Sequence, residues 1–194
     1  LGIGTSSGNS ATPVQVKGAD GEGYLTDVVD IASGYDHNIA LKSDGSVWAW
    51  GYNSYYHLGD GTTERRSTPV QVKGTDGNGY LADIVAVSAG QYYSVALKAD
   101  GSVWSWGYNN YGQTGVGTYD TDPKGQHFIE KYPVQVKGPN SSDYLSGIVA
   151  VGAARGYSIA LKSDGSLWSW GNGGNGQLGN GTTQISRAYQ VKGP

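Results

Sequence analysis

Short runs of alternating apolar and polar residues recur along the whole chain. One such run extends from His37 to Lys42, and an apolar run from Val28 to Ile31 comes just before it. Alternation with a period of two is typical of half-buried β-strands, because successive side chains point to opposite faces of a sheet. No window has a helical period long enough to indicate a helix. The pattern therefore predicts an all-β protein.

An Asp-Gly pair connects the alternating run to the next predicted strand. Asp44-Gly45 lies between two apolar segments, and such a pair favours a type I′ turn in which both central residues have positive φ. The following strand carries Trp48 and Trp50, which are two residues apart and share one face. We expect these indoles to bury a large area against a neighbouring sheet.

A fourth strand is predicted where Val14 and Val16 alternate with polar residues. Pro13 stands at its start, and proline in a strand favours an edge position because it has no N–H to donate. The segment Pro-Val-Gln-Val-Lys-Gly returns at 69–74 and 133–138, and a variant of it occupies 188–193. Each copy closes a unit of four predicted strands.

The four-strand unit is an internal repeat. The segment LKSDGSVWAWG at 41–51 returns nearly unchanged at 97–107 and 161–171. The chain thus divides into residues 1–18, the tail of a preceding repeat, and three full repeats at 19–74, 75–138 and 139–194, with an insertion at 116–132 in the second. The structural positions that recur are Asp44, Gly45, Trp48, Trp50, Asp100, Gly101, Trp104, Trp106, Asp164, Gly165, Trp168 and Trp170.

Four-stranded units of this spacing, rich in glycine and tryptophan, predict the blades of a β-propeller. GYDHNIALKSDGSVWAWG, with a later loop ending in Gly-Gln-Thr-Gly (112–115) or Gly-Gln-Leu-Gly (176–179), resembles the repeat of the RCC1 (regulator of chromosome condensation) propeller family. The resemblance covers essentially the whole chain and implies a propeller of typically about seven blades. Three full blades and part of a fourth are therefore expected to belong to a larger propeller, or to associate with further copies through exposed terminal blades.

Composition removes several classes of protein. The 194 residues include 33 glycines and no cysteine, which excludes a disulfide scaffold, a thiolate zinc site and a cysteine nucleophile. The formal net charge is -3, so the chain lacks the excess of basic residues that is typical of a nucleic-acid binder. No apolar run reaches the length of a membrane span. We therefore expect that the chain does not bind nucleic acid and does not span a membrane.

The histidines do not indicate a catalytic site. His37 occupies the position of Tyr93 and Tyr157 in the other repeats, and His57 occupies that of Gln113. Neither tyrosine nor glutamine can replace a histidine base, so both positions are interpreted as structural. The sequence therefore predicts a protein that is not an enzyme and that has no cofactor.

Two glycine-rich loops contain side chains that could bind calcium. Segments 20–23 (Asp-Gly-Glu-Gly) and 76–79 (Asp-Gly-Asn-Gly) supply oxygen ligands of the kind that Ca²⁺ prefers. The third repeat loses the pattern, so a plain turn is the favoured interpretation and no metal site is predicted. Calcium binding stays open as the alternative.

The positive signal for function lies in the loops that follow each Trp-x-Trp-Gly strand. These loops are rich in Tyr, Asn, Ser and Gly, the residues that binding loops favour because tyrosine offers rigid contact area at a low entropic cost. Long insertions on a repeat scaffold often lie on the functional face. Packing between blades, or ordinary surface, is the alternative interpretation. The candidate binding residues are Tyr52, Tyr55, Tyr56, Tyr108, Tyr111, Tyr119, His127 and Phe128.

These observations favour a non-catalytic scaffold that binds a protein, a glycan or further copies of itself. The resemblance implies more: bacterial relatives of the repeat are mostly extracellular or surface proteins, and one group inhibits β-lactamases by protein contact. The nuclear member of the family is a guanine-nucleotide exchange factor. A regulatory propeller acting on a partner enzyme is therefore the alternative function, and an extracellular or cell-surface location is the expected one.

Overall fold

A computed structural model describes residues 1–5, 9–117, 128–140, 142–181 and 184–193. These residues contain strands and turns but no helix, and the strands form three antiparallel sheets of four strands each. Within every sheet the strands lie in chain order. The strands are β1 (Val28–Ser33), β2 (His37–Lys42), β3 (Val47–Gly51), β4 (Arg66–Gln71), β5 (Ile84–Ala89), β6 (Tyr93–Lys98), β7 (Val103–Tyr108), β8 (Ile129–Gln135), β9 (Ile148–Ala153), β10 (Tyr157–Lys162), β11 (Leu167–Asn172) and β12 (Gln184–Gln190).

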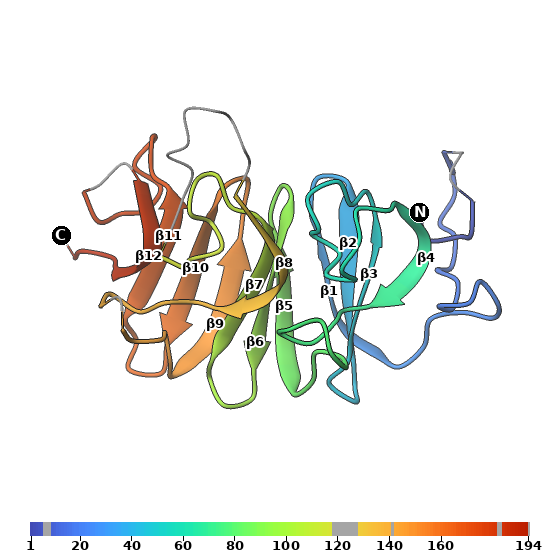
Figure 1. Cartoon of the computed structure of the whole chain (residues 1–194), viewed down its shortest axis with the longest axis horizontal. Coiled ribbons are helices and arrows are strands. Elements are labelled where there is room, and N and C mark those ends of the chain that lie inside the picture. Colours follow the sequence, from blue (N-terminus) through green and yellow to red (C-terminus); the bar gives the residue numbers. More distant parts are fainter. Residues whose placement is uncertain (6–8, 118–127, 141, 182–183, 194) are drawn as a thin grey trace.

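The three sheets stand side by side in the order of the sequence (Figure 1). Neighbouring sheets touch through their first two strands: β1 and β2 contact β5, whereas β5 and β6 contact β9. Meander sheets stacked in this way are the blades of a propeller. The all-β propeller fold predicted from the repeats is therefore confirmed, and we call the sheets blades 1, 2 and 3.

The Asp-Gly hairpins differ from the predicted type. Gly45 has φ 79°, whereas Asp44 is not among the residues with positive φ, so the expected type I′ turn was wrong. The N–H of Gly45 donates to the carbonyl of Lys42, and the N–H of Lys42 donates to the carbonyl of Ser46. This is a three-residue loop with a glycine in the left-handed region. The carboxylate of Asp44 favours it by accepting the N–H and the hydroxyl of Ser46 at 2.9 and 2.6 Å.

The fourth strand also differs in detail. Proline lies in the edge strand, as expected, but Pro69 is inside β4 and not at its start. Gly51 pairs with Arg66 and Ala49 with Val70, so that residues 67–69 together oppose a single residue of β3. A bulge of this kind needs no ladder N–H from proline. The copy at 13–18 is not a strand in the described part of the chain, so the strand predicted there was wrong; Lys17 forms an isolated bridge with Tyr24, as Lys73 does with Tyr80.

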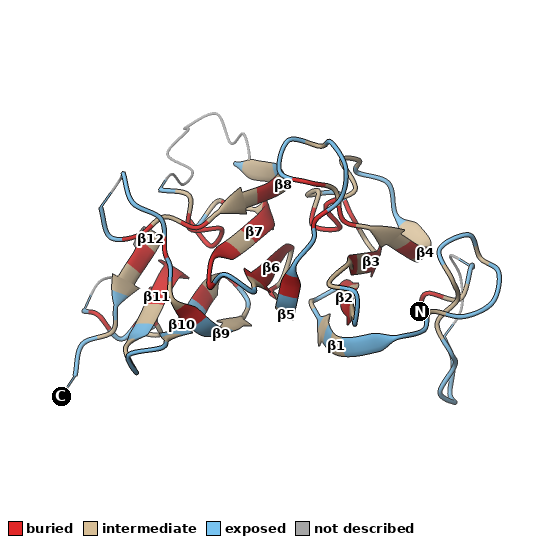
Figure 2. Cartoon of the chain, turned by 90° about the horizontal axis from the view of Figure 1, so that it is seen from below, coloured by how far each residue is buried: buried red, intermediate tan, exposed pale blue. Residues whose placement is uncertain are grey.

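The core lies between blades rather than inside one sheet. Between blades 1 and 2, Ile39, Leu41 and Val47 pack in one cluster with Ile84 and Trp106. The equivalent residues of blades 2 and 3 form the second cluster. Figure 2 shows the buried residues concentrated in the strands where the blades face one another. Since the apolar side chains of each sheet are covered by the next, stacking of blades supplies the stability of the fold.

The two tryptophans of each repeat have different surroundings. Trp106 and Trp170 are fully buried, whereas Trp48, Trp104 and Trp168 are half-buried. The indole of Trp104 lies beneath the ammonium of Lys98, whose Nζ is 5.6 Å from the ring centroid. The shared face predicted from their spacing thus has an inner position that packs between blades and an outer one near solvent.

Candidate interaction site

The loop after β3 is held in place by blade 2. The carbonyl oxygen of His57 accepts hydrogen bonds from Nε1 of Trp106 at 3.0 Å and from Oγ of Ser94 at 2.8 Å. The carbonyl of Gln113 receives the equivalent bonds from Trp170 and Ser158, at 2.9 and 3.2 Å. A fully buried tryptophan of one blade therefore fixes the loop of the preceding blade. The side chains on that loop are held in defined positions as a result.

The two histidines of the first junction are buried and neutral. Nε2 of His37 lies 3.0 Å from Oγ of Ser94, and the centroids of the His37 and His57 rings are 4.6 Å apart. Burial lowers the pKa of His37 to about 3, with the charge of His57 as a smaller cause. Burial likewise lowers the pKa of His57 to about 4. These rings pack the junction, in agreement with the structural role expected for both positions.

The second junction has a different polar pair at the same positions. Tyr93 is fully buried, and its hydroxyl donates to the carbonyl of Tyr157 and lies 3.0 Å from Oγ of Ser158. Burial raises the pKa of the Tyr93 hydroxyl. Tyr93 and Gln113 thus replace the two histidines of the first junction, so the propeller accepts either pair at the same point of contact.

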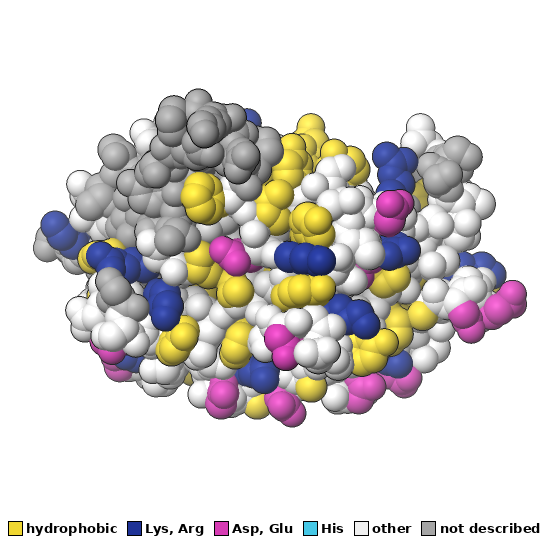
Figure 3. Space-filling model, viewed as in Figure 1, with side chains coloured by type: hydrophobic (Ala, Val, Ile, Leu, Met, Phe, Trp, Pro, Cys, Tyr) yellow, Lys and Arg dark blue, Asp and Glu magenta, His cyan; other side chains and the backbone are white. Residues whose placement is uncertain are grey.

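Five tyrosines form a continuous chain of ring contacts at the end of the blades where these loops lie. We call Tyr35, Tyr92, Tyr55, Tyr108 and Tyr111 the tyrosine strip. Successive ring centroids are 5.9, 5.1, 5.0 and 6.4 Å apart, distances typical of interacting aromatic pairs. Tyr35 and Tyr111, at its two ends, are 68% and 45% exposed. Figure 3 shows a group of hydrophobic side chains, a class that includes tyrosine, at the top centre of the molecule.

The predicted binding residues are brought together only in part. Three of them are members of the strip, and Tyr52 lies beside it, with its ring centroid 6.2 Å from that of Tyr92. Tyr56 stands apart, since its ring faces Nζ of Lys131 at 5.7 Å. Phe128 is 38% exposed and its N–H donates to Oδ1 of Asn110. The other two predicted residues, Tyr119 and His127, lie outside the described residues.

Sequence reasoning missed Tyr35 and Tyr92. Both lie in the short turn between the first and second strands of a blade, outside the loops that follow the third strands. The available signal was position: the turn after the first strand and the loop after the third strand emerge at the same end of an antiparallel sheet. These two tyrosines connect the loops of consecutive blades into one surface.

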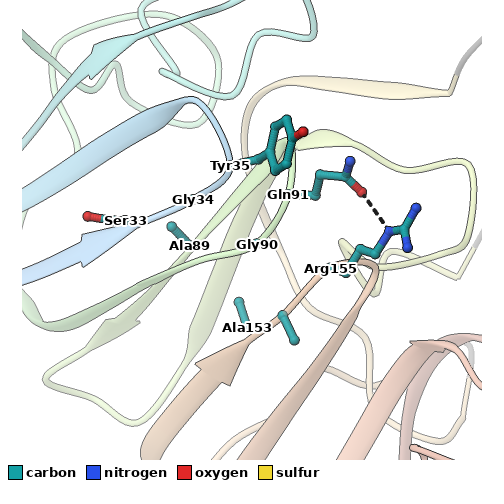
Figure 4. Close-up of a pocket in the computed structure, with 9 residues that line it drawn as sticks. Ser33, Gly34, Tyr35, Ala89, Gly90, Gln91, Ala153 and Arg155 are labelled. Carbon is teal, nitrogen blue, oxygen red and sulfur yellow. Dashed lines mark hydrogen bonds between the residues drawn. The ribbon is translucent and has the colours of Figure 1, made fainter. Parts of the chain in front are cut away.

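A cavity of about 580 Å³ lies next to the strip, where the first strands of the three blades end. Its lining comes from the same three positions of each blade (Figure 4): Ser33, Gly34, Tyr35, Ala89, Gly90, Gln91, Ala153, Ala154 and Arg155. The backbones are close here. A Cβ at Gly90 would lie 2.4 Å from the carbonyl oxygen of Ala154, so glycine is required for blade 3 to approach.

The acidic loops considered for calcium close their own turns. Oδ1 of Asp20 accepts the N–H of Glu22, and Oδ1 of Asp76 accepts that of Asn78, both at 2.9 Å. Across the part of the chain that the structure describes, no group of three or more His, Cys, Asp or Glu residues could hold a metal ion. Within the same ranges, no helix is long and apolar enough to span a membrane.

Three blades joined through buried tryptophans define a segment of a β-propeller. The chain belongs to the Regulator of chromosome condensation (RCC1) repeat family, whose profile matches residues 44–97, 100–161 and 164–191. A second profile of the same repeat matches 28–56, 84–113 and 148–177. The family expected from the Trp-x-Trp-Gly repeats is thereby confirmed.

Curated relatives contain these repeats within longer chains. The human E3 ubiquitin-protein ligase HERC2 is 34% identical over 160 residues, which are 82% of this chain and 3% of HERC2. The Ultraviolet-B receptor UVR8 of Arabidopsis thaliana is 30% identical, over 78% of this chain and 31% of the receptor. The chain thus spans about a third or less of these relatives. The likeness to HERC2 covers only its RCC1 repeats.

Solved structures show the same fold. Yeast RCC1 (Prp20) bound to Kap60 superposes with a TM-score of 0.70 at 24% identity, over 87% of this chain and 38% of that one. Human WBSCR16 has a TM-score of 0.67 at 26% identity, over 85% and 39%. A further structure of Prp20p, which binds Gsp1p and histones, has a TM-score of 0.69. Propellers of this family are mostly non-catalytic regulators that bind protein partners.

Proposed function

We propose that this chain is a non-catalytic interaction scaffold that binds a protein partner through the tyrosine strip. The observation that carries the proposal is the unbroken chain of ring contacts from Tyr35 to Tyr111, which crosses the junction of blades 1 and 2. Tyrosines held by neighbouring rings lose little conformational entropy on binding, so their contact area contributes efficiently to affinity. A glycan partner is the alternative ligand for the same surface.

The test compares the strip with tyrosines elsewhere on the surface. The Tyr55→Ser/Tyr92→Ser variant interrupts the strip, whereas Tyr80→Ser/Tyr144→Ser removes rings that are 54% and 50% exposed and lie outside it. Partners captured by the wild-type chain are identified, purified and titrated against all three proteins. We expect the strip variant to lose at least tenfold in affinity and the control to bind like wild type. Equal binding by the strip variant would overturn the proposal.

Self-association forms the second part of the proposal, because the two end faces of the stack repeat the buried junctions. On blade 1, Val28 and Ile31 are 37% and 70% exposed, while their blade 2 equivalents Ile84 and Val87 are 3% and 7% exposed. On blade 3, the side chains of the opposite end face are also exposed: Ile159, Leu161 and Leu167 are 37%, 36% and 41% exposed. Exposed apolar faces of this kind favour contact with another blade.

Light scattering over a range of concentrations tests the self-association. A mass above 20.3 kDa that rises with concentration, and that returns to 20.3 kDa in an Ile31→Lys variant, supports association through the end face. A wild-type chain that stays at 20.3 kDa throughout would contradict it. Circular dichroism of the variant verifies that the blades remain folded.

A regulator of a partner enzyme is the second candidate function, favoured by membership of the family. It predicts saturable binding to one folded enzyme, a GTPase in the exchange-factor case or a β-lactamase in the inhibitor case, with a change in that enzyme's rate. The scaffold proposal predicts binding without such a change. We also propose an extracellular or cell-surface location, supported by the cysteine-free, tyrosine- and glycine-rich composition. Fractionation of the source cells tests it.

A further inference from the structure

Three polar side chains line one side of the cavity next to the tyrosine strip. Tyr35, Gln91 and Arg155 occupy the same position in blades 1, 2 and 3, and Figure 4 shows them side by side, with Ser33, Ala89 and Ala153 along the opposite side. The repeats are nearly identical in their central strands, yet these equivalent positions carry an aromatic ring, an amide and a guanidinium. The cavity is therefore chemically distinct at each blade.

Arg155 is oriented by blade 2 but not neutralised by it. Its Nε donates to Oε1 of Gln91 at 3.3 Å (Figure 4). None of the ion pairs formed by the described residues involves Arg155, whereas Arg66 holds the carboxylate of Asp60 at 2.6 Å. The two terminal nitrogens of a guanidinium form a planar fork that matches a carboxylate with two parallel hydrogen bonds. The bond to Gln91 uses Nε alone and leaves that fork available.

We propose that this cavity binds the carboxylate of an Asp or Glu side chain on the protein partner, with an adjacent apolar or aromatic side chain lying on Tyr35. The inference rests on the proposed function, since the same partner would continue along the tyrosine strip. Ala89 and Ala153 supply an apolar wall for the methylene groups of the acidic side chain. One unpaired guanidinium balances one negative charge, which matches a carboxylate better than a phosphate dianion.

The overall charge of the chain does not oppose this contact strongly. The formal net charge is -3, but at physiological ionic strength charges are screened beyond about 8 Å. The charge within contact distance of the bound group is therefore the one that matters. Asp36, which follows Tyr35 in the chain, lines a different cavity, together with Arg65 and Arg66. Arg155 is the cation among the residues that line the proposed site.

A pair of matched probes isolates the carboxylate. N-acetyl-Trp-Glu-amide and N-acetyl-Trp-Gln-amide have nearly the same shape and differ in one charge. Each is titrated into the ¹⁵N-labelled chain at physiological ionic strength, and the amide shifts of Gln91 and Arg155 are followed by NMR. We expect the Glu probe to bind about fivefold more tightly than the Gln probe, because exposed charged pairs contribute modestly. The preference disappears in Arg155→Gln and persists in Arg65→Gln, an exposed arginine outside the cavity.

Each contrary result identifies which part of the proposal is wrong. Equal affinity for the two probes, or a preference that survives Arg155→Gln, overturns the carboxylate site. Absence of shifts at Gln91 and Arg155 with both probes overturns it as well. Inorganic phosphate that displaces the Glu probe at lower concentration than acetate overturns the choice of carboxylate over phosphate. The proposed function is judged separately, by the Tyr55→Ser/Tyr92→Ser variant and its own partner, so the failure of one is distinguishable from the failure of the other.

Discussion

Nε1 of Trp106 donates a hydrogen bond to the carbonyl oxygen of His57, 3.0 Å away across the junction of blades 1 and 2. The bond joins a residue that repeats in every blade to a loop that differs between blades. Gly59 makes the approach possible, because a Cβ at this position would lie 2.8 Å from that same Nε1. One contact therefore connects the stability of the stack to the placement of Tyr55 and its neighbours in the strip.

Replacement of Trp106 by phenylalanine tests how much this contact contributes to the free energy of unfolding. Trp106→Phe removes the hydrogen bond and leaves a partly empty space in a fully buried site, so we expect the free energy of unfolding to fall by about 2 kcal/mol. Trp104→Phe is the matched control, since Trp104 is half-buried, and it is expected to cost less than about 1 kcal/mol. Urea denaturation measures both. Equal losses would mean that the junction does not depend on Trp106.

Comparison of Gly59→Ala with Gly79→Ala separates two costs of adding a methyl group, which are backbone strain and a clash with a neighbouring side chain. Gly59 has φ 67° and would clash with Trp106, whereas Gly79 has φ 58° with no heavy atom within 4 Å of the added Cβ. Backbone strain alone costs about 1–2 kcal/mol at either position. We expect Gly79→Ala to show only that loss, and Gly59→Ala to lose about 3 kcal/mol or more by the same urea measurement. Similar losses would show that the indole can move aside.

The two buried histidines predict a pH dependence of stability. Burial depresses the pKa of His37 to about 3 and that of His57 to about 4, both below the unfolded value of 6.5. The unfolded chain therefore binds more protons below pH 6.5, and stability is lost as the pH falls from there toward 4. By pH 5 each histidine contributes a loss of about 2 kcal/mol.

The second junction supplies the control for this prediction. His37→Tyr/His57→Gln introduces the pair found at Tyr93 and Gln113, and His127 is the same in both proteins. We expect the variant to be nearly independent of pH between 7.5 and 5, measured by urea denaturation at each pH. An unchanged slope in the variant would show that the acid sensitivity arises elsewhere.

A buried ion pair in blade 1 gives a further prediction. Asp60 has a side chain only 6% exposed, accepts Nη2 of Arg66 at 2.6 Å, and also accepts a hydrogen bond from Asn53. Arg66→Gln leaves that carboxylate without its cation, and we expect a loss of about 2 kcal/mol. Lys42→Gln is the control: its partner Asp27 is 3.9 Å away and exposed, so the change should stay within about 0.5 kcal/mol. Thermal unfolding of both variants checks the difference.

The sequence predicted the strands and the blades well because their signals are local and are written three times. Alternation in β2, the Asp-Gly pair and the Trp-x-Trp-Gly strand each need only a few neighbouring residues to be understood. The hairpin type was wrong because it depends on the carboxylate of Asp44 binding Ser46, a contact that the dipeptide preference does not include. Pro69 was misplaced for a similar reason, since the bulge in β4 depends on its pairing with β3.

The candidate site could be predicted only in part. Tyr52, Tyr55, Tyr108 and Tyr111 were found because their loops are rich in tyrosine. Tyr35 and Tyr92 join them through contacts between blades: Tyr35 meets Tyr92, 57 residues away, and Tyr92 meets Tyr55, 37 residues away. Likewise, Arg155 meets Gln91 64 residues away. Nothing local to these residues encodes such contacts.

By itself the sequence determined the units of this protein: strands of period two, hairpins at Asp-Gly, and blades that cannot bury their apolar faces alone. The tertiary structure decided how the blades meet. The angle and distance between sheets, set by Trp106, Trp170 and the close backbone approach at Gly90, place tyrosines of different repeats ring against ring. A repeat encodes its own fold through neighbouring residues. A surface shared by several repeats exists only once side-chain packing has fixed the geometry between them.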